Sequence, residues 1–266
     1  LTVELARKMD ARSVVFLRSS EMLEQSLYKY KCHECNLMLP VGDDLYRKFS
    51  PSSVDGKIEL MYDGLNKEEL CEPMPIRESF PVRWLAVGSE SHYKGWQDLA
   101  AAIDQLEADP EFPEVTIDFT GSAPVSPLNN MSLDRERRTK FNFIGRVRNL
   151  KSSAREYGLT LHTSREESIG LAAMEILAAG VPLLASRTGV IHKIQENEDL
   201  LFTPGDVRDL ASKISNLKEN WTGIHFGFDK CKAKILDKFI NENISAEFAH
   251  KMDVLGYRGD NRSFPN

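Results

Sequence analysis

The stretch "LTLHTSREESIGLAAMEILAAGVPLLAS", residues 159–186, contains a complete strand–helix–strand unit. Its two ends, 159–164 and 181–186, are short apolar runs of the kind that form strands covered on both faces. Between them lies a helical run of small apolar residues that carries one carboxylate, Glu175. This order predicts two parallel strands joined by a helix that packs against them.

The same alternation of strand-like and helix-like runs extends to both sides of this stretch. The runs expected as strands are 14–17, 83–88, 115–121, 141–145, 159–164, 181–186 and 200–203. Strands that alternate with helices at this spacing indicate a parallel sheet with helices on both faces. We therefore predict an α/β fold whose main domain, residues 80–220, is a doubly wound parallel sheet of about six strands.

The remainder of the chain predicts three smaller segments. Residues 1–40 hold about one helix, one strand and another helix, which is too little for an independent domain. We expect them to be the tail of an N-terminal domain whose body lies outside this chain, which begins at Leu1. Residues 41–79 are rich in Pro, Gly, Asp and Ser and predict a linker with about one short strand. Residues 221–266 predict a C-terminal helical segment that crosses back toward the tail.

The composition excludes several functional classes. The 266 residues are 41% hydrophobic and 28% charged, and the formal net charge is -6, so we expect no nucleic-acid partner, which would require a basic face. The most apolar run, 171–186, is interrupted by Glu175 and is too short to span a membrane. The first residues lack the apolar core of a signal peptide. These features predict a cytoplasmic location.

The four cysteines are too few for a disulfide framework in a chain of this size. Cys32, His33 and Cys35 have the spacing of zinc ligands, but Cys71 and Cys231 are isolated and no second ligand pair is present. The pattern favours reduced thiols, which suit the cytoplasm, and zinc stays the lesser alternative.

Ligands of open α/β sheets bind beyond the carboxyl ends of the strands, which makes three loops candidates: 88–95, 145–149 and 164–171. In the first, Gly88 ends a strand and Lys94 precedes the start of a helix, where a lysine and the helix dipole together attract an anion. This loop has neither the GxxxxGK[ST] nor the GxGxxG pattern. The alternative for Lys94 is an ordinary solvated lysine.

The third loop has the sharper pattern. Gly170 lets the backbone approach a ligand closely, and free amides at the start of the next helix suit sugar or phosphate oxygens. Ala172, Glu175 and Ala179 share one helix face, so the small residues leave room beside the carboxylate. The alternative is that Glu175 is solvated and Glu167 is an acid favoured by the helix dipole. On these residues alone, both interpretations stay open.

Several segments in a fixed order resemble the nucleotide-sugar-binding half of a GT-B glycosyltransferase. These are Gly88 with Lys94 and Gly95, "FIGRV" (143–147), residues 164–186, and "LLFTPGDVRDLASKI" (200–214). They are most similar to the large retaining family 4, whose architecture is that of glycogen synthase. Members carry two glutamates separated by seven residues, with (F/I)GL after the first, and Glu167 and Glu175 have this separation whereas Glu166 does not.

The resemblance is strong over about 80–220 and weaker over 14–50. It implies that 80–220 is a Rossmann-like nucleotide-sugar-binding domain and that 1–40 is the remnant of an N-terminal Rossmann-like domain. The donor, a nucleoside diphosphate sugar, would be a substrate, and neither cofactor nor metal would be needed. The acceptor is unknown, the missing N-terminal domain would be a partner, and peripheral membrane contact of a full-length protein stays open.

The resemblance also implies roles for individual residues. Glu175 would bind the ribose hydroxyls. The catalytic residues would be Glu167, which contacts the transferred sugar, and Lys94, which holds the diphosphate as it leaves. The backbone amides of Ile169, Gly170 and Leu171 would contact the sugar or diphosphate. The remaining donor-binding positions would be Gly88, beside the diphosphate, and Arg146 with Val147, beside the base.

Two positions depart from the family pattern. Ser89 stands where the family commonly has an arginine, so one diphosphate cation is missing, and "ENEDLLF" (196–202) lacks the usual glycines of that turn. The leading hypothesis is a retaining glycosyltransferase, with little activity expected of this chain alone. The alternative is a non-catalytic GT-B-like module that binds a nucleotide sugar or a partner. A GT-B-fold epimerase or phosphorylase is weaker, because the pair Glu167 and Glu175 favours a transferase.

Overall fold

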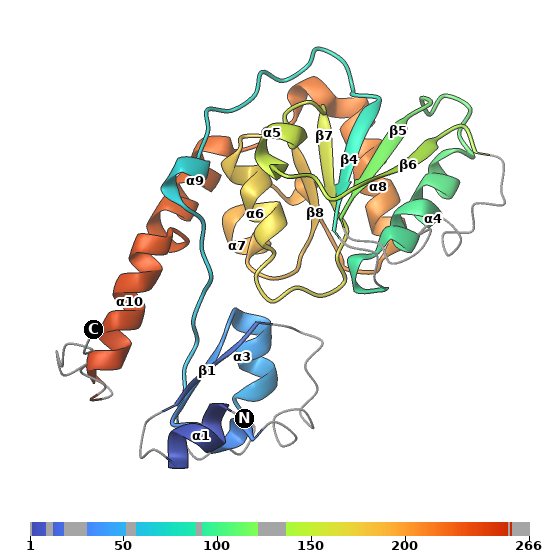
Figure 1. The fold of residues 1–266 in the computed structure, drawn as a ribbon. Helices are drawn as coiled ribbons and strands as arrows, with labels where there is room; N and C mark the ends of the chain where they lie inside the picture. The colour runs from blue at the N-terminus through green and yellow to red at the C-terminus, as the bar shows by residue number, and fades with distance from the viewer. Residues whose placement is uncertain are drawn as a thin grey trace.

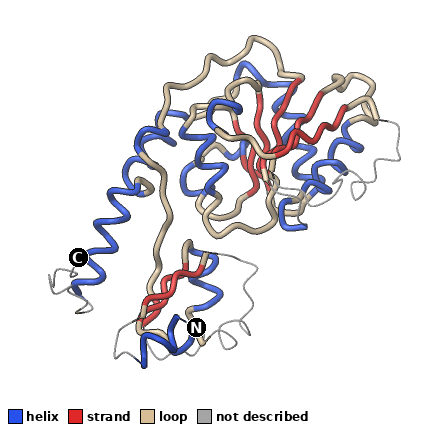
Figure 2. Tube along the Cα trace, in the orientation of Figure 1, coloured by secondary structure: helices blue, strands red, loops and turns tan. Residues whose placement is uncertain are grey.

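The computed structural model describes residues 2–8, 13–18, 31–51, 57–88, 92–121, 137–254 and 256. These residues form two separate parallel sheets, one of six strands and one of three, each with helices packed against it. Figure 2 shows the strands of the two sheets as separate red groups.

The larger sheet confirms the predicted six parallel strands of the main domain. Its strands are β4 (Arg83–Val87), β5 (Thr116–Thr120), β6 (Lys140–Gly145), β7 (Leu159–His162), β8 (Leu183–Ser186) and β9 (Leu201–Phe202). They lie in the order β6-β5-β4-β7-β8-β9, and every neighbouring pair is parallel. The chain thus begins in the middle at β4, adds strands on one side, and then crosses to the other side at β7, as in doubly wound sheets.

Helices cover both faces of this sheet, which is why its strands are almost wholly apolar. On one face lie α4 (Trp96–Leu106) and α8 (Val207–Asn220). On the other lie α5 (Leu150–Ala154), α6 (Leu171–Ala178), α7 (Ile191–Ile194) and α9 (Phe228–Lys238). Strand β4 shows the alternation, because Trp84 packs in the first core and Leu85 in the second.

The smaller sheet contains β1 (Val14–Leu17), β2 (Leu37–Pro40) and β3 (Lys57–Ile58), all parallel and in that order. On one face, Leu17 and Met38 pack with α1 (Thr2–Lys8) and α3 (Asp43–Phe49). On the other face, Leu37 and Leu39 pack against α10 (Asn241–Val254). The C-terminal helix therefore crosses back to the N-terminal segment, and Figure 1 shows it running down beside β1.

Two chain segments connect the sheets, and they touch each other. The segment after β3 and the segment between α9 and α10 form a parallel bridge at Leu65 and Ile240. The amide of Leu65 donates to the Phe239 carbonyl (2.8 Å), and the amide of Asn241 donates to the Leu65 carbonyl (2.9 Å).

Residues 41–79 carry more regular structure than the expected linker. They contain α3, β3 and the 3-10 turn Lys67–Glu69, and strand β2 ends just before them. The sequence "DDLYRKF" (43–49) does carry a helical signal, because it has acidic residues in its first turn and basic residues in its last. In the structure, Leu45 and Phe49 are buried one helical turn apart. Most of the helix expected at 19–31 lies outside the described residues.

Gly42 brings the smaller sheet's segment against the loop that carries Glu167. Its φ of 97° lies in the left-handed region, and a Cβ at this position would come within 1.9 Å of the Ser168 carbonyl oxygen. Two polar contacts reinforce the approach: the Ser168 hydroxyl donates to the Arg18 carbonyl (3.1 Å), and Lys193 Nζ pairs with Asp43 (2.5 Å).

Replacing Gly42 with Ala tests this contact. The methyl group has no space and the backbone angle is strained for an L-residue, so we expect a loss of about 2 kcal/mol or more in the free energy of unfolding. Gly223→Ala is the matched control, because nothing lies within 4 Å of its Cβ position. Urea unfolding of the two variants measures the difference, and equal stability would contradict a tight contact at Gly42.

Candidate functional site

The strand order of the larger sheet reverses between β4 and β7, and the candidate site lies there. The loop after β4 leads through the 3-10 turn His92–Lys94 into α4, and the loop after β7 carries Glu167 into α6. At such a reversal the two loops diverge to opposite faces of the sheet and leave a crevice for a ligand.

Lys94 and Glu167 meet across this crevice. Lys94 Nζ lies 2.6 Å from Glu167 Oε1, and the side chains are 25% and 14% exposed. The same oxygen accepts a hydrogen bond from Ser164 Oγ (2.7 Å) and lies 3.1 Å from His162 Nε2. Glu167 Oε1 therefore has three partners, whereas Oε2 accepts no hydrogen bond from any described residue and faces no competing donor.

The surroundings of Glu167 keep it ionised. Burial raises the pKa of a carboxyl group, but the imidazole of His162 and the ammonium of Lys94 outweigh burial and lower the pKa of Glu167 to about 2. His162 Nδ1 is buried without a hydrogen-bond partner. Its other ring nitrogen, Nε2, is the one that faces Glu167 Oε1.

The turn that carries Lys94 is fixed directly to the Glu167 loop. Thr163 Oγ1 donates to the Lys94 carbonyl (2.7 Å), and the amide of Arg165 donates to the Tyr93 carbonyl (2.5 Å). Gly95 has a φ of 64°, and a Cβ there would lie 2.1 Å from the Thr163 carbonyl oxygen. The glycine after Lys94 is thus required by the close approach of the two loops.

Two cavities meet at Lys94. The first cavity, of about 260 Å³, is lined by Val87, Gly88, Lys94, Thr120, Gly121, Arg146, Val147, Leu150 and Ala172. The second cavity, of about 370 Å³, is lined by Arg18, Asp63, Lys94, Glu167, Ser168, Ile169, Gly170, Leu171 and Ala172. Lys94 and Ala172 line both, so the two cavities are neighbours, and we refer to them together as a track with Lys94 at the junction.

The structure brings together most of the residues singled out in the sequence. Gly88, Arg146 and Val147 line the first cavity, and Glu167 with the three residues Ile169–Leu171 line the second. Glu175 lines neither, although it lies on α6 one turn after Ala172 and is half-buried. Burial, and then the charge of Glu69, raise the pKa of Glu175. Ser89 lies outside the described residues.

Sequence reasoning missed four residues that shape the site. His162 and Ser164 end an apolar strand with polar side chains at alternate positions, and this break in the apolar pattern was an available signal. Arg18 and Asp63 line the second cavity and pair with each other at 2.8 Å. They come from β1 and the segment after β3, so no local sequence pattern links them to Glu167.

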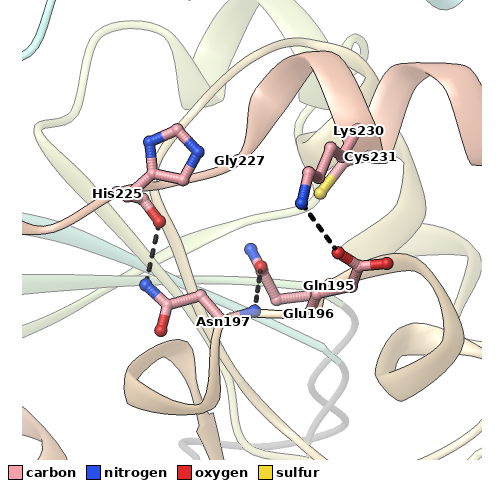
Figure 3. A pocket seen from close by; sticks show the side chains of 7 residues that line it. All are labelled: Gln195, Glu196, Asn197, His225, Gly227, Lys230 and Cys231. Atoms are coloured by element: carbon pink, nitrogen blue, oxygen red, sulfur yellow. Dashed lines mark hydrogen bonds and ion pairs between the residues drawn. The ribbon is translucent and has the colours of Figure 1, made fainter.

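A further cavity, of about 240 Å³, lies at the start of α9 and is shown in Figure 3. Gln195 donates to the Phe226 carbonyl and accepts from the Asn197 amide, and Lys230 pairs with Glu196. These polar side chains bond to neighbours at the cavity wall and hold α9 against the loop after α7.

Within the described ranges, no group of three or more His, Cys, Asp or Glu side chains is placed to hold a metal ion, and this includes the surroundings of Cys32, His33 and Cys35. All four cysteines carry free thiols. Across the part of the chain that the structure describes, the helices are too short or too polar to cross a membrane.

The sequence profile of the family Glycosyl transferases group 1 matches residues 79–232, more than half of the chain. The chain belongs to this family. The match begins just before β4 and ends within α9, so it contains the whole six-stranded sheet and both loops of the crevice.

Two curated relatives resemble this chain in sequence. It is 22% identical over 222 residues to the uncharacterized glycosyltransferase MJ1607 of Methanocaldococcus jannaschii, a match that covers 76% of this chain and 56% of the relative. It is 37% identical over 59 residues to the sulfoquinovosyl transferase SQD2 of Arabidopsis thaliana, which covers 20% of this chain and 12% of the relative. The chain thus spans about half the length of MJ1607 and a small part of SQD2.

Solved structures share its fold. HepE of Anabaena in complex with UDP and glucose superimposes with a TM-score of 0.74 at 17% identity, covering 95% of this chain and 74% of HepE. Sucrose-phosphate synthase of Thermosynechococcus elongatus superimposes with a TM-score of 0.71 at 17% identity. The match covers 96% of this chain and 70% of the synthase. This chain shares the fold of these two structures, with a parallel sheet between helices.

The lowered pKa of Glu167 gives a pH-dependent prediction. A carboxyl group whose pKa falls from 4.5 to about 2 on folding stabilises the folded state above about pH 4.5, and this contribution is lost as the pH falls toward 2. Glu167→Gln should therefore cost up to about 3 kcal/mol at pH 7. The difference from the unmodified protein should narrow below pH 4.5.

Urea unfolding at pH 7, 5 and 3.5 provides the measurement. Glu111→Gln, at an exposed position in the loop after α4, serves as the control and should shift stability little at any of these pH values. A Glu167→Gln effect that stays constant between pH 7 and 3.5 would refute the ion-pair account.

Proposed function

We propose that this protein is the nucleotide-sugar-binding part of a retaining, family 4 glycosyltransferase that moves a sugar from a nucleoside diphosphate sugar to an acceptor hydroxyl. The observation that carries the proposal is the track of two cavities with Lys94 at the junction and Glu167 beside it. A nucleotide sugar has the same order of parts: an uncharged nucleoside, an anionic diphosphate, and a hydroxyl-rich sugar.

The first cavity suits the nucleoside. Gly88 and Gly121 leave the ends of β4 and β5 without side chains, and Arg146 and Val147 lie where they can contact a base. Glu175 is our candidate for the ribose hydroxyls, because it follows Ala172 by one helical turn and its neighbours on α6 are small. This role and those of the other donor-binding residues belong to the proposal.

The second cavity suits the sugar. Glu167 Oε1 contacts Lys94, Ser164 and His162. The other carboxylate oxygen, Oε2, can therefore accept hydrogen bonds from sugar hydroxyls. The low pKa of Glu167 keeps this acceptor anionic at neutral pH. The first amides of α6, after Gly170, have no carbonyl partner within the helix and are directed toward the same space.

We propose the following reaction at these positions. The bond from the anomeric carbon to the diphosphate oxygen breaks, and its electron pair leaves with the diphosphate. The acceptor oxygen bonds to the anomeric carbon on the same face, so configuration is retained, and its proton passes to the departing phosphate oxygen. Lys94 stabilises the negative charge that grows on the diphosphate. We assign Glu167 to substrate binding and propose no metal and no covalent sugar–enzyme intermediate.

A non-catalytic nucleotide-sugar-binding module is the second candidate. Ser89 favours it, because the family commonly has an arginine at that position and a missing cation weakens leaving-group stabilisation.

Both candidate functions require that the protein binds a nucleotide, so a measurement of nucleotide binding tests them together. Titration calorimetry with UDP, GDP and ADP should give measurable binding for at least one. Lys94→Ala should weaken that binding by about 2 kcal/mol and Glu175→Ala by about 1–3 kcal/mol, as expected for lost hydrogen bonds to charged groups. Lys140→Ala, at the exposed start of β6, is the control and should bind as the unmodified protein does. Absence of binding by all three nucleotides, in a folded sample at millimolar ligand, would reject both candidates.

Sugar transfer separates the transferase from the module. Positioning of the acceptor supplies up to about 7–11 kcal/mol of the barrier reduction, so we expect very slow transfer or slow donor hydrolysis by this chain alone. A longer protein that adds an N-terminal domain to this chain should give a product that retains the anomeric configuration, which NMR of the product detects. Glu167→Ala should reduce turnover more than nucleotide affinity. An inverted product would contradict the retaining assignment, and an inactive longer protein that still binds nucleotide would favour the module.

A further inference from the structure

Arg165 connects the two loops of the crevice through its side chain. It lies two residues before Glu167, and its guanidinium reaches across to the Lys94 turn. Nε donates to Asp98 Oδ2 (2.7 Å), and NH2 donates to Asp98 Oδ1 (2.5 Å), which forms a bidentate pair. The third nitrogen, NH1, lies 2.6 Å from His92 Nε2.

The two partners of Arg165 flank Lys94. His92 begins the 3-10 turn that ends at Lys94, and Asp98 lies in the first turn of α4. One guanidinium therefore holds both ends of the short segment whose middle carries the candidate diphosphate cation. The backbone of Arg165 also holds this segment in place, because its amide donates a hydrogen bond to the Tyr93 carbonyl (2.5 Å).

The ion pair between Arg165 and Asp98 is bidentate and largely buried. The Asp98 side chain is 6% exposed and that of Arg165 is 31% exposed, so loss of the arginine would leave a nearly buried carboxylate without its cation. A bidentate pair also fixes the angle between its partners, which a lysine with its single ammonium does not do. Arg165 lines neither cavity, so any effect on a ligand has to act through other residues.

We propose that Arg165 is a positioning residue, which holds Lys94 at the junction of the two cavities and thereby sets the affinity for the donor diphosphate. The role rests on the proposed function, because it concerns the same donor site. It makes the phosphate-binding turn and the sugar-binding loop one rigid unit: the side chain that orients Lys94 belongs to the loop that presents Glu167.

The test compares ligands with and without phosphate. Arg165→Lys should lower the affinity for the nucleoside diphosphate that binds, chosen from UDP, GDP and ADP, by about 10-fold, since small displacements of a charged group have effects of this size. Affinity for the matching nucleoside, which has no phosphate for Lys94 to hold, should change less than about 2-fold. Titration calorimetry measures both. An equal loss for both ligands would indicate a merely structural role and would overturn the proposal.

The same helix provides a matched control. Arg137 forms a bidentate pair with Asp104 of α4 through the same two nitrogen positions, Nε and NH2, at 2.5 and 3.0 Å. Arg137→Lys disrupts an equivalent pair away from Lys94 and should leave both affinities unchanged. If Arg137→Lys lowers diphosphate affinity as much as Arg165→Lys does, positioning by Arg165 is refuted.

A double-variant cycle supplies the direct evidence of coupling. In a Lys94→Ala background, Arg165→Lys should change diphosphate affinity less than about 2-fold, because the cation that it positions is gone. A further 10-fold loss in that background would show that Arg165 acts independently of Lys94 and would overturn the proposal. Should Arg165→Lys fail to fold, His92→Ala replaces it: the side chain is exposed, only the third contact is lost, and a 2- to 5-fold loss confined to the diphosphate is expected.

This design also separates the proposal from the function on which it rests. If the unmodified protein binds none of the three nucleoside diphosphates, the proposed function fails, and the positioning role fails with it. If the unmodified protein binds one and Arg165→Lys binds it equally well, only the positioning role is rejected.

Discussion

The strand order of the larger sheet is the constraint on which the candidate site depends. Residues 73 positions apart, Lys94 and Glu167, come within 2.6 Å because β4 and β7 are adjacent while the chain leaves them toward opposite faces. The connection after β4 passes through α4, and the connection after β7 passes through α6. Their first turns border one space from two sides.

The small apolar residues around the two glutamates follow from the same geometry. Close contact between the loops requires Gly95 against Thr163 and Gly189 against the Ile169 carbonyl, where a Cβ would come within 2.3 Å. Such close packing leaves the Glu167 side chain only 14% exposed, and burial raises the pKa of a carboxyl group. The ion pair with Lys94 and the contacts with His162 and Ser164 reverse that effect. The acid and its tight surroundings are therefore parts of one arrangement.

How far the sequence predicts this structure depends on whether the signal is local. Strands such as 83–87 and 159–162 are continuous apolar runs between helical runs, so the sheet could be predicted, and the loops after them identified Lys94 and Glu167. Pairing of Arg165 with Asp98 has no local signal, because it joins residues 67 positions apart through side chains. The same holds for Arg18 and Asp63. The helix 43–49 was overlooked because Pro, Gly and Ser on both sides outweighed its own amphipathic pattern.

The bridge between Leu65 and Ile240 has a mechanical consequence. Both covalent connections between the sheets pass through this one point, where they are hydrogen-bonded to each other. The other contacts between the two bodies, such as Gly42 with Ser168 and Asp43 with Lys193, are noncovalent, so a hinge at this point would break those contacts while the internal contacts of each body stay intact. Such a hinge would move Arg18, at the end of β1, relative to Glu167, which lies on the larger body. The second cavity would then change its width, and the contact of Gly42 with Ser168 would act as the stop that sets its narrowest state.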